Sequence, residues 1–377
     1  MRRTIFFVLT LLAAAGTSLA QQWEPDLTAT QRYMQNHFWN RNTQNFVRRA
    51  DQPDAPGSDS WGITIVLDAD AYLVAEGRMK PAELKQYFVS SSMLYGRTNG
   101  NSGARVLARQ GDQIYVGGDD DLQWSAALAH CYLVTKDSDY LTAATSSFGA
   151  LIDMGFWQDG SANGSKGWSW NSDDRRPNGV STAYGALAAA RLYEATRDNV
   201  YKQWCTASLN ALETPQVGFF PRDRMVAAEA AMTAYHISHE EPFQERALQL
   251  EEQATTQALT FLHHDGTGER NPTDIGDLAD GLAYFSTVTH DAKYRTLATT
   301  FIQFFAAHRT PRDISDHGFY SRYDTKGTPI MTGAYLGVPC SIPFLPEVAE
   351  MLKLFAIASP TSTSPTSSNH AAKTKSH

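Results

Sequence analysis

Apolar and small residues recur at spacings of three and four along most of this chain, which is the spacing of one face of an α-helix. Three of these helical stretches end in the same turn, Thr-x-Asp-x-x-Tyr, at residues 135–140, 196–201 and 289–294. Another helical stretch follows each turn. The Asp of the motif is placed to cap the new helix, and the Tyr falls in its first turn and can cover the junction. The pattern therefore predicts a repeated helical hairpin.

Weaker turns at residues 77–81 and 238–242 extend the series to five hairpins. They separate helices expected over residues 61–76 and 82–93, and over residues 224–237 and 243–262. Helices expected near residues 27–38 and 346–356 are placed to pair as the sixth hairpin. Alternation typical of strands is sparse. The predicted fold is therefore all-α, an (α/α)6 toroid or six-hairpin barrel.

The two ends of the chain differ in composition from the part between them. Residues 1–20 carry Arg2 and Arg3, an apolar run and small residues before Ala20, a pattern typical of a signal peptide cleaved after Ala20. Residues 359–377 are rich in Ser, Thr, Pro and Lys, which predicts a disordered tail. The sequence thus predicts one domain over residues 21–358, secreted or periplasmic, with no membrane span.

Composition narrows the kind of ligand. The predicted domain keeps 28 of the 32 Lys and Arg residues and all 40 Asp and Glu residues, a net charge of −12. This charge argues against nucleic acid and anionic membranes as partners. Cys131, Cys205 and Cys340 are expected to be buried free thiols. Zinc-ligand spacings and phosphate-binding loops are missing from the sequence, and adjacent His263 and His264 would point about 100° apart, so we expect no metal and no cofactor.

Candidate chemistry lies at Asp119, Asp120 and Asp121, which follow two glycines and begin a predicted helix. Adjacent carboxylates repel one another and raise each other's pKa, so such a run indicates catalysis, helix capping or a calcium loop. Long loops at residues 97–118 and 158–178 precede predicted inner helices, and such loops often carry function. Aromatic residues in or near these and later loops would stack on sugars or pack the toroid: Tyr115, Trp157, Trp168, Trp170, Phe219 and Phe220.

Several motifs resemble glycoside hydrolase family 76, the endo-α-1,6-mannanases, over about residues 30–300. The first is the run Asp120-Asp121-Leu-Gln-Trp124 at the helix start; two others are the segments at residues 167–171 and 178–183. The chain departs from the family pattern at Pro177, at Thr182 and in the segment of residues 274–280. These departures bear on the substrate more than on the fold.

The resemblance implies retaining hydrolysis of α-mannan by a monomeric (α/α)6 enzyme without a metal. Family members use the first of two adjacent aspartates as nucleophile and the second as acid/base, which assigns these roles to Asp120 and Asp121 and leaves Asp119 outside the pair. Retaining enzymes hold the two carboxyl groups about 5–5.5 Å apart. Substrate contacts are expected at Trp61, Tyr115, Trp124, Trp168, Trp170 and Asn178.

Other readings remain open at this point. The chain could be an exo-mannosidase, an unsaturated uronyl hydrolase or a sugar epimerase on the same scaffold. An epimerase would use histidines, and those available lie near predicted hairpin ends: His236, His239, His263 and His264. A non-catalytic glycan-binding protein and a calcium-dependent structural protein are two further possibilities. Two sets of aspartates could face the cavity or lie on solvated helix faces: Asp68 and Asp70, and Asp274, Asp277 and Asp280.

Overall fold

The computed structural model describes residues 23–55, 60–92, 96–97, 105–106, 108–109, 115–160, 164–263, 271–307, 318–324, 328–336 and 338–359. The predicted signal peptide and most of the predicted tail lie outside the described residues. Ser359 is described: it is buried, and its carbonyl accepts a hydrogen bond of 2.5 Å from Arg78. The ordered domain therefore extends to the first residue of the segment predicted as tail.

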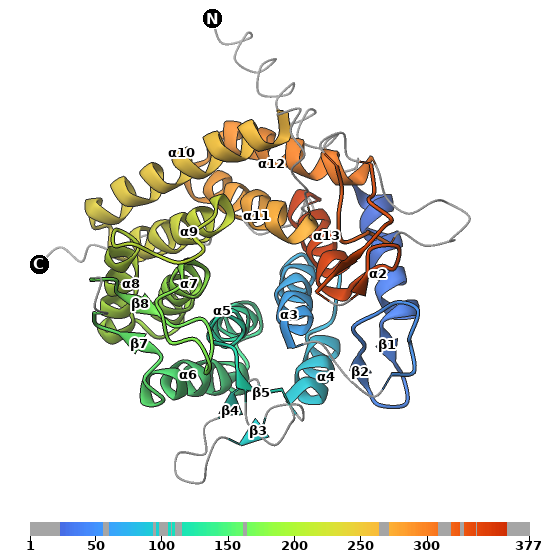
Figure 1. Ribbon diagram of the computed structural model, residues 1–377, viewed down its shortest axis with the longest axis horizontal. Coiled ribbons are helices and arrows are strands. Elements are labelled where there is room, and N and C mark those ends of the chain that lie inside the picture. The colour runs from blue at the N-terminus through green and yellow to red at the C-terminus, as the bar shows by residue number, and fades with distance from the viewer. Residues whose placement is uncertain are drawn as a thin grey trace, which may run out of the picture.

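Within these residues, twelve α-helices form two concentric rings, which confirms the predicted all-α toroid (Figure 1). The inner ring consists of α3 (Ser60–Ala75), α5 (Gly118–Thr135), α7 (Gly179–Thr196), α9 (Pro221–Ser238), α11 (Pro272–Thr289) and α13 (Leu345–Ala358). The outer ring consists of α2 (Glu24–His37), α4 (Pro81–Ser92), α6 (Ser138–Asp153), α8 (Asn199–Ala211), α10 (Glu241–His263) and α12 (Ala292–Ala306). The first and last helices, α2 and α13, pack together as predicted and close the ring.

The strands in the described residues are two residues long and form five antiparallel pairs in the loops. They are β1 (Trp39–Asn40) with β2 (Asn45–Phe46), β3 (Gly96–Arg97) with β4 (Arg105–Val106), β5 (Ala108–Arg109) with β6 (Tyr115–Val116), β7 (Trp157–Gln158) with β8 (Gly167–Trp168), and β9 (Ala334–Tyr335) with β10 (Val338–Pro339). Most of these pairs lie in segments that lead into inner helices, so they shape one end of the toroid.

The repeated turn works as its residue types predict. Asp137, Asp198 and Asp291 are the N-caps of α6, α8 and α12, and each carboxylate accepts the backbone N–H two residues later at 2.9–3.0 Å. These bonds satisfy N–H groups that the first helical turn leaves without a partner. Tyr140 and Tyr294 are almost fully buried at the hairpin junction, as expected for the last position of the motif.

The structure adds a fourth copy of this turn. The residue between Thr and Asp has a left-handed backbone in each predicted copy, at Lys136, Arg197 and His290, with φ of 57–61°. His239, with φ of 58°, occupies the same position after α9. Its neighbours Ser238 and Glu240 take the places of the Thr and the Asp of the motif. The Ser238 hydroxyl accepts the Glu240 backbone N–H at 3.3 Å. The turn that the sequence marks only weakly is thus a Ser/Glu version of the same motif.

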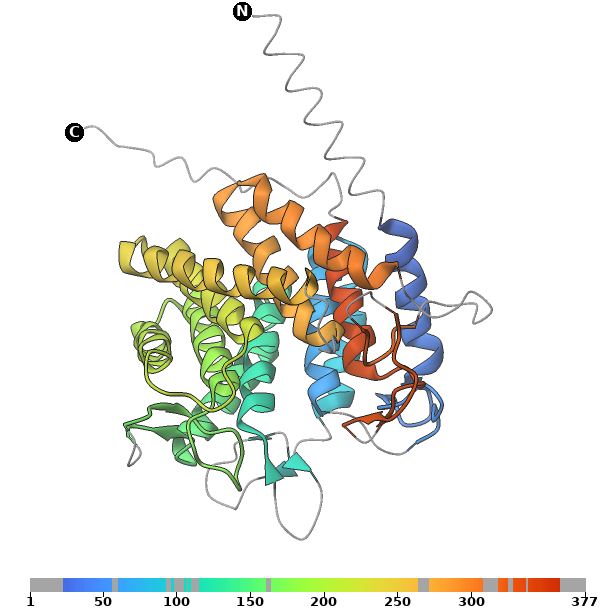
Figure 2. The ribbon, with the colours of Figure 1, turned by 45° about the horizontal axis from the view of Figure 1, so that its top comes forward.

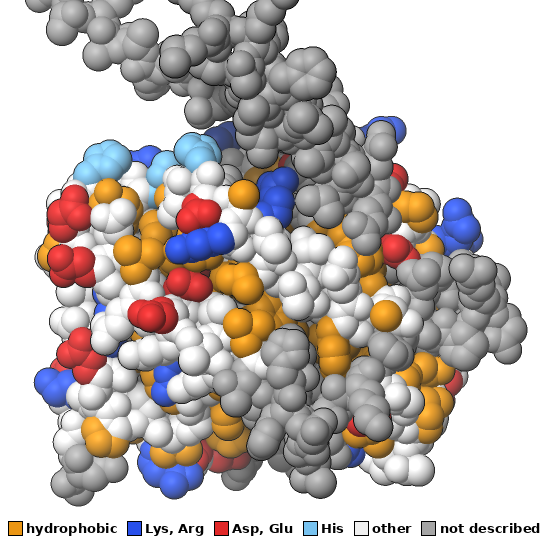
Figure 3. All heavy atoms as spheres, turned by 90° about the horizontal axis from the view of Figure 1, so that it is seen from above, with side chains coloured by type: hydrophobic (Ala, Val, Ile, Leu, Met, Phe, Trp, Pro, Cys, Tyr) orange, Lys and Arg blue, Asp and Glu red, His pale blue; other side chains and the backbone are white. Residues whose placement is uncertain are grey.

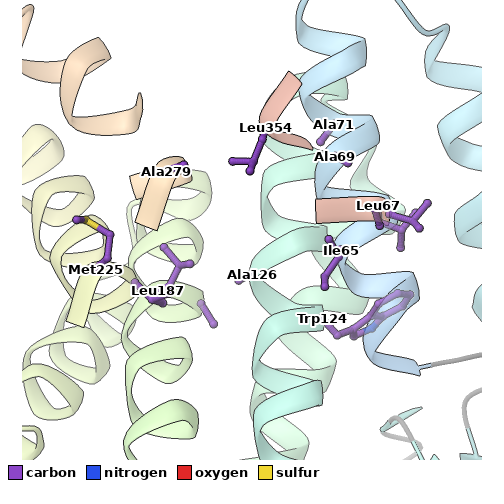
Figure 4. Packing of buried hydrophobic residues seen from close by; sticks show 14 of the residues in the cluster. Ile65, Leu67, Ala69, Ala71, Trp124, Ala126, Leu187, Met225, Ala279 and Leu354 are labelled. Carbon is purple, nitrogen blue, oxygen red and sulfur yellow. The ribbon is translucent and has the colours of Figure 1, made fainter. Parts of the chain in front are cut away.

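Small residues let the inner helices approach one another closely. Alanine fills many buried positions of α7 and α9, and Figure 4 shows side chains from all six inner helices meeting in the core, among them Leu67, Met225 and Leu354. At Gly276 on α11 a Cβ atom would overlap the Glu350 side chain of α13. The inner helices can therefore close the ring around the axis only because the residues at such contacts are small.

On the face of the molecule seen in Figure 3, acidic and basic side chains are interspersed, and neither charge dominates. The three cysteines are free and buried, as predicted. In the described part of the chain, no helix has the length and apolar character needed to cross a membrane.

We expect Asp198→Ala to lower the free energy of unfolding by about 1 kcal/mol, because the first turn of α8 loses its N-cap. Asn199→Ala at the next, exposed position should cause no loss, since alanine favours the helix. Urea unfolding followed by circular dichroism would measure both. Equal stability of Asp198→Ala and the native protein would contradict the capping role.

Candidate active site

The amino-terminal ends of the inner helices meet at one end of the toroid, here called the mouth, which lies at the bottom of Figure 2. Asp119 and Asp120 are the second and third residues of α5, so they lie at this end. One turn further along α5, Gln123, Ala126 and Ala127 line the central cavity. Asp119 and Asp120 come four and three residues before Gln123, so they lie at the mouth one turn above this cavity-lining residue.

Two glycines allow the loop before α7 to reach this helix start. The Gly118 N–H donates to the Trp170 carbonyl at 2.7 Å, and a Cβ atom on Gly118 would overlap the Ser169 carbonyl oxygen. This close approach brings Trp170 over the aspartates. Its indole N–H donates to Asp119 Oδ2 at 3.1 Å, while the side chain stays 46% exposed. A flat aromatic surface thus lies beside a carboxylate at the mouth.

Burial raises the pKa of Asp119, against the opposing effect of N–H donors from the α5 backbone and from Trp170. The positive charge of Arg222 on α9 also acts to lower the pKa of Asp119. The net direction is upward, so the Asp119 carboxyl keeps its proton to a higher pH than an exposed aspartate.

Asp121 does not belong to this group, although the sequence pattern predicts it as the acid/base. Its side chain is 0% exposed and lies between α5 and the outer helix α6, where Oδ1 accepts the Ser147 hydroxyl at 3.1 Å. Two residues along a helix turn the side chain by about 200°, so Asp121 points away from the face occupied by Gln123. The adjacent pair at the mouth is therefore Asp119 and Asp120.

Trp168 and Trp124 are likewise turned into the core, contrary to the expectation that they contact substrate. Trp168 is 0% exposed, packs edge-on against Trp157 at 5.6 Å between ring centroids, and donates from its indole N–H to Ser208 at 3.0 Å. Trp124 shares the outward face of α5 with Asp121 and lies against Phe88 of α4. Both indoles serve packing of the hairpins.

Three further predicted contacts have different positions. Asn178 is the N-cap of α7, and its Oδ1 accepts the N–H groups of Val180 and Ser181, so its oxygen is engaged in the fold. Trp61 is the second residue of α3, partly exposed at the level of the mouth. The backbone of Tyr115 is in β6, but its side chain lies outside the described residues.

Arg222 is a mouth residue that the sequence analysis does not single out. It is the second residue of α9, and its Nη1 forms an ion pair of 2.5 Å with Asp274 of α11. Below it, the Tyr184 hydroxyl of α7 donates to Asp277 at 2.8 Å. Three neighbouring inner helices, α7, α9 and α11, are thus joined by polar contacts at or just below the mouth.

The cavity beneath the mouth contains about 420 Å³ of space that atoms do not fill, part of it open to solvent. Charged side chains line its floor, and Asp68 of α3 lies at their centre. Asp68 pairs with Arg191 of α7 at 2.9 Å and with His130 of α5 at 2.8 Å, and it lies 3.9 Å from Lys353 of α13. One carboxylate therefore connects four of the six inner helices.

The same cluster reaches the two remaining inner helices. Arg191 also pairs with Glu229 of α9 at 2.9 Å, and Lys353 pairs with Asp280 of α11 at 3.1 Å and with Glu350 at 3.0 Å. Burial opposes ionisation of Asp68, but Arg191, His130 and Lys353 outweigh it and hold the pKa of Asp68 well below its usual range. Burial raises the pKa of Glu229 to about 7 despite Arg191.

The five residues Asp68, Arg191, Glu229, Asp280 and Lys353 are called the ionic floor below. The sequence does carry a signal for one of them: Glu229 is a single charge inside the apolar run of residues 225–235. The sequence left open whether two sets of aspartates face the cavity or lie on solvated helix faces. Asp68, Asp277 and Asp280 face the cavity.

Asp70, two residues after Asp68, lies on the opposite face of α3. It is 2% exposed, and among the residues that the structure describes one of its carboxylate oxygens, Oδ2, has no hydrogen-bond partner. Burial raises the pKa of Asp70 well above its usual value. The two aspartates of α3 therefore have opposite electrostatic environments, one stabilised as an anion and the other as a neutral acid.

This architecture is a six-hairpin toroid with paired carboxylates at its mouth, the scaffold of several glycosidases. Solved structures with the same fold include a family 76 glycoside hydrolase from Bacteroides thetaiotaomicron, with 14% identity, a TM-score of 0.70, and coverage of 88% of this chain and 76% of that one. The α-1,6-mannanase of Salegentibacter sp. has 15% identity and a TM-score of 0.64 over 89% of this chain and 98% of its own. The fold that the resemblance to family 76 implies is therefore confirmed.

The same scaffold also supports a different reaction. The cellobiose 2-epimerase of Spirochaeta thermophila has 12% identity and a TM-score of 0.64, over 93% of this chain and 98% of that one. No family model matches the sequence, and no curated protein matches it. The comparisons thus define a six-hairpin glycosidase-type fold, and the reaction has to be argued from the residues at the mouth.

We expect Asp68→Asn to lower the free energy of unfolding at pH 7 by about 3–5 kcal/mol, because it leaves Arg191 and Lys353 without their shared anion. The low folded-state pKa means that Asp68 stabilises the protein above the unfolded-state pKa of about 3.9 and loses this contribution as the pH falls. Denaturant unfolding at pH 7 would measure the loss in Asp68→Asn, and unfolding of the native protein as the pH is lowered from 5 to 2 would follow its pH dependence.

Asp70→Asn is the matched control on the same helix. Because its pKa is raised in the folded state, Asp70 favours folding at low pH. This contribution to stability is lost as the pH rises above about 3.9. The neutral amide should therefore be as stable as the native protein at pH 4 and more stable at pH 8. Similar losses of stability in Asp68→Asn and Asp70→Asn would contradict the electrostatic environments assigned to the two aspartates.

Proposed function

We propose that this protein is a secreted retaining glycoside hydrolase that cleaves α-mannan, with endo-α-1,6-mannanase activity, and that Asp119 and Asp120 are its catalytic carboxylates. The observation that carries the proposal is the position of these two adjacent residues at the start of α5, one turn above the cavity-lining Gln123, with Asp119 hydrogen-bonded to the exposed indole of Trp170. Retaining hydrolysis needs two carboxyl groups that flank the scissile bond about 5–5.5 Å apart, a separation that neighbouring residues can supply.

In this mechanism Asp120 keeps the nucleophile role predicted from the sequence. It attacks the anomeric carbon and forms a glycosyl ester as the bond to the leaving oxygen breaks. Asp119, whose pKa is raised by burial, gives its proton to that oxygen. Water then attacks the anomeric carbon as it gives a proton to Asp119; the bond to Asp120 breaks, both carboxyl groups are restored and the sugar is released.

The names of the structural neighbours support this choice of substrate and residues. An α-1,6-mannanase of Salegentibacter sp. is described in complex with α-1,6-mannotriose and, in another structure, with α-1,6-mannotetrose. In both structures the enzyme is an inactive variant in which two consecutive aspartates are replaced. Consecutive aspartates also begin α5 of this chain, which supports the proposed pair.

An epimerase on this fold is the main alternative. His236 and His239 lie at the end of α9, far from the mouth, and His130, in the last part of α5, contacts Asp68 of the ionic floor. The described residues at the mouth are carboxylates, an exposed indole and a guanidinium. This set favours acid and nucleophilic catalysis at a glycosidic bond over proton transfer by histidine.

We expect Asp119→Asn and Asp120→Asn each to lower kcat on linear α-1,6-mannan by about 10³-fold or more, since each removes one of two obligatory carboxyl groups. Asp121→Asn is the matched control: its amide oxygen can still accept the Ser147 hydroxyl, so activity should stay within a few-fold of native. Release of new reducing ends would be measured, with circular dichroism as the folding check.

Product analysis with azide assigns the two roles. A retaining α-glycosidase lacking its acid/base gives the α-azide from an activated substrate, whereas one lacking its nucleophile gives the β-azide. We expect the α-azide from Asp119→Ala and the β-azide from Asp120→Ala. Normal activity in both Asn variants, with inactivity in Asp121→Asn, would contradict the proposed pair.

Trp170→Phe tests the bond between the indole and Asp119 while keeping an aromatic surface. Its N–H stabilises the ionised carboxylate, so its loss should raise the pKa of Asp119 further. If Asp119 is the acid, the alkaline limb of the kcat/KM profile moves to higher pH. A shift confined to the acidic limb would instead make Asp119 the nucleophile.

A further inference from the structure

Three loops at the mouth are joined edge to edge by backbone contacts. Isolated β-bridges link Gly117 to Asn171, Ser169 to Pro177, and Asn178 to Val217. They connect the start of α5 with the loop before α7, and that loop with the one before α9. A continuous backbone rim therefore runs along three consecutive inner helices and is called the stitched rim below.

The stitched rim carries exposed apolar side chains. Eight large hydrophobic residues are exposed in the described part of the chain, and five of them lie in loops that precede inner helices: Trp170, Val217, Phe220, Met331 and Leu336. The other three lie singly on outer helices, where an exposed apolar residue is ordinary. The concentration at the mouth indicates a surface that is covered when a ligand binds.

Phe220 is held in its exposed position by the neighbouring structure. Its backbone N–H donates to the Asp223 carboxylate at 2.7 Å, which anchors it at the start of α9. The preceding Phe219 is turned inward, with the Arg224 guanidinium 4.3 Å from its ring centroid. The Gly179 N–H donates to the Val217 carbonyl at 2.9 Å, and a Cβ atom on Gly179 would lie 2.7 Å from Phe219 Cβ. The backbone is thus fixed while the Phe220 ring remains 54% exposed.

The occupant of this surface has to be apolar on one face and uncharged. Arg222, two residues after Phe220, is already paired with Asp274, so it does not demand an anionic ligand. A pyranose ring presents C–H groups on one face and hydroxyls at its edge, and such a face stacks on an aromatic ring. The stitched rim includes Trp170, which contacts Asp119, and continues to the loop that carries Phe220. Its apolar surface therefore adjoins the proposed site of bond cleavage.

We propose that Phe220, with Val217 in the same loop, is a second sugar-binding position on the stitched rim, which holds the part of a glycan chain that extends beyond the Asp119–Asp120 pair. The inference rests on the proposed function, because it takes the neutral polysaccharide as ligand. It makes Phe220 a determinant of chain length: long chains reach it and short oligosaccharides do not. Phe220 takes no part in the chemical step.

The test compares Phe220→Ala with Val200→Ala, which removes an exposed apolar side chain from the outer helix α8. The substrates are α-1,6-manno-oligosaccharides of increasing length and linear α-1,6-mannan. We expect Phe220→Ala to lower kcat/KM about tenfold on long chains, equivalent to about 1.4 kcal/mol, and less than twofold on the shortest cleaved oligosaccharide. Val200→Ala should match the native enzyme at every length. Equal losses at all lengths, or no loss on polymer, would overturn the proposal.

A binding measurement separates this inference from the proposed hydrolysis. Native protein, Phe220→Ala and Val200→Ala are run in native gels that contain undegraded α-1,6-mannan. Retardation of the native protein and Val200→Ala, but much less of Phe220→Ala, supports the sugar-binding position even if no reducing ends are released. Equal retardation of all three, or retardation of none, rejects it.

Discussion

The fold depends on placing buried charges of both signs at the axis of a helical ring. Asp68 is shared by Arg191, His130 and Lys353, and through Glu229 and Asp280 the same cluster reaches all six inner helices. Each charge loses hydration on burial, and only partners from other helices compensate that loss. The cluster therefore favours one closed arrangement of the ring, because an open ring would leave charges buried without their partners.

This floor is also the reason why we propose catalysis at the mouth and not at the centre of the toroid. Most of the charged groups of the ionic floor are engaged with one another across the axis. The carboxylates at the start of α5 lie above it, where helix starts supply N–H donors and loops supply exposed aromatic surface. Gly118 permits the close contact that brings Trp170 to Asp119, so the site depends on a backbone approach as much as on its side chains.

Much of the architecture could be predicted from the chain because its signals are local. The Thr-x-Asp-x-x-Tyr turn caps a helix with atoms only two residues apart, and apolar spacing identifies the helices that it joins. The fourth turn, at Ser238 and Glu240, was recognised only weakly because its geometry is kept with different side chains. The aspartate run was likewise visible, since three adjacent acids at a helix start are unusual in any sequence.

By itself, the sequence determined the hairpins, the order of the inner and outer helices and the helix that carries the aspartates. Only the tertiary structure decided that Asp121 is buried against α6 while Asp119 lies beside Trp170, because a helix turns each successive side chain by about 100° and the direction of the axis is set by packing. Tertiary packing also buried Trp168 and left Trp170 exposed two residues later in the same loop, and it brought Asp68 and Lys353 together across 285 residues of chain. Contacts between distant segments have no local sequence pattern, so they could be found only once the ring had closed.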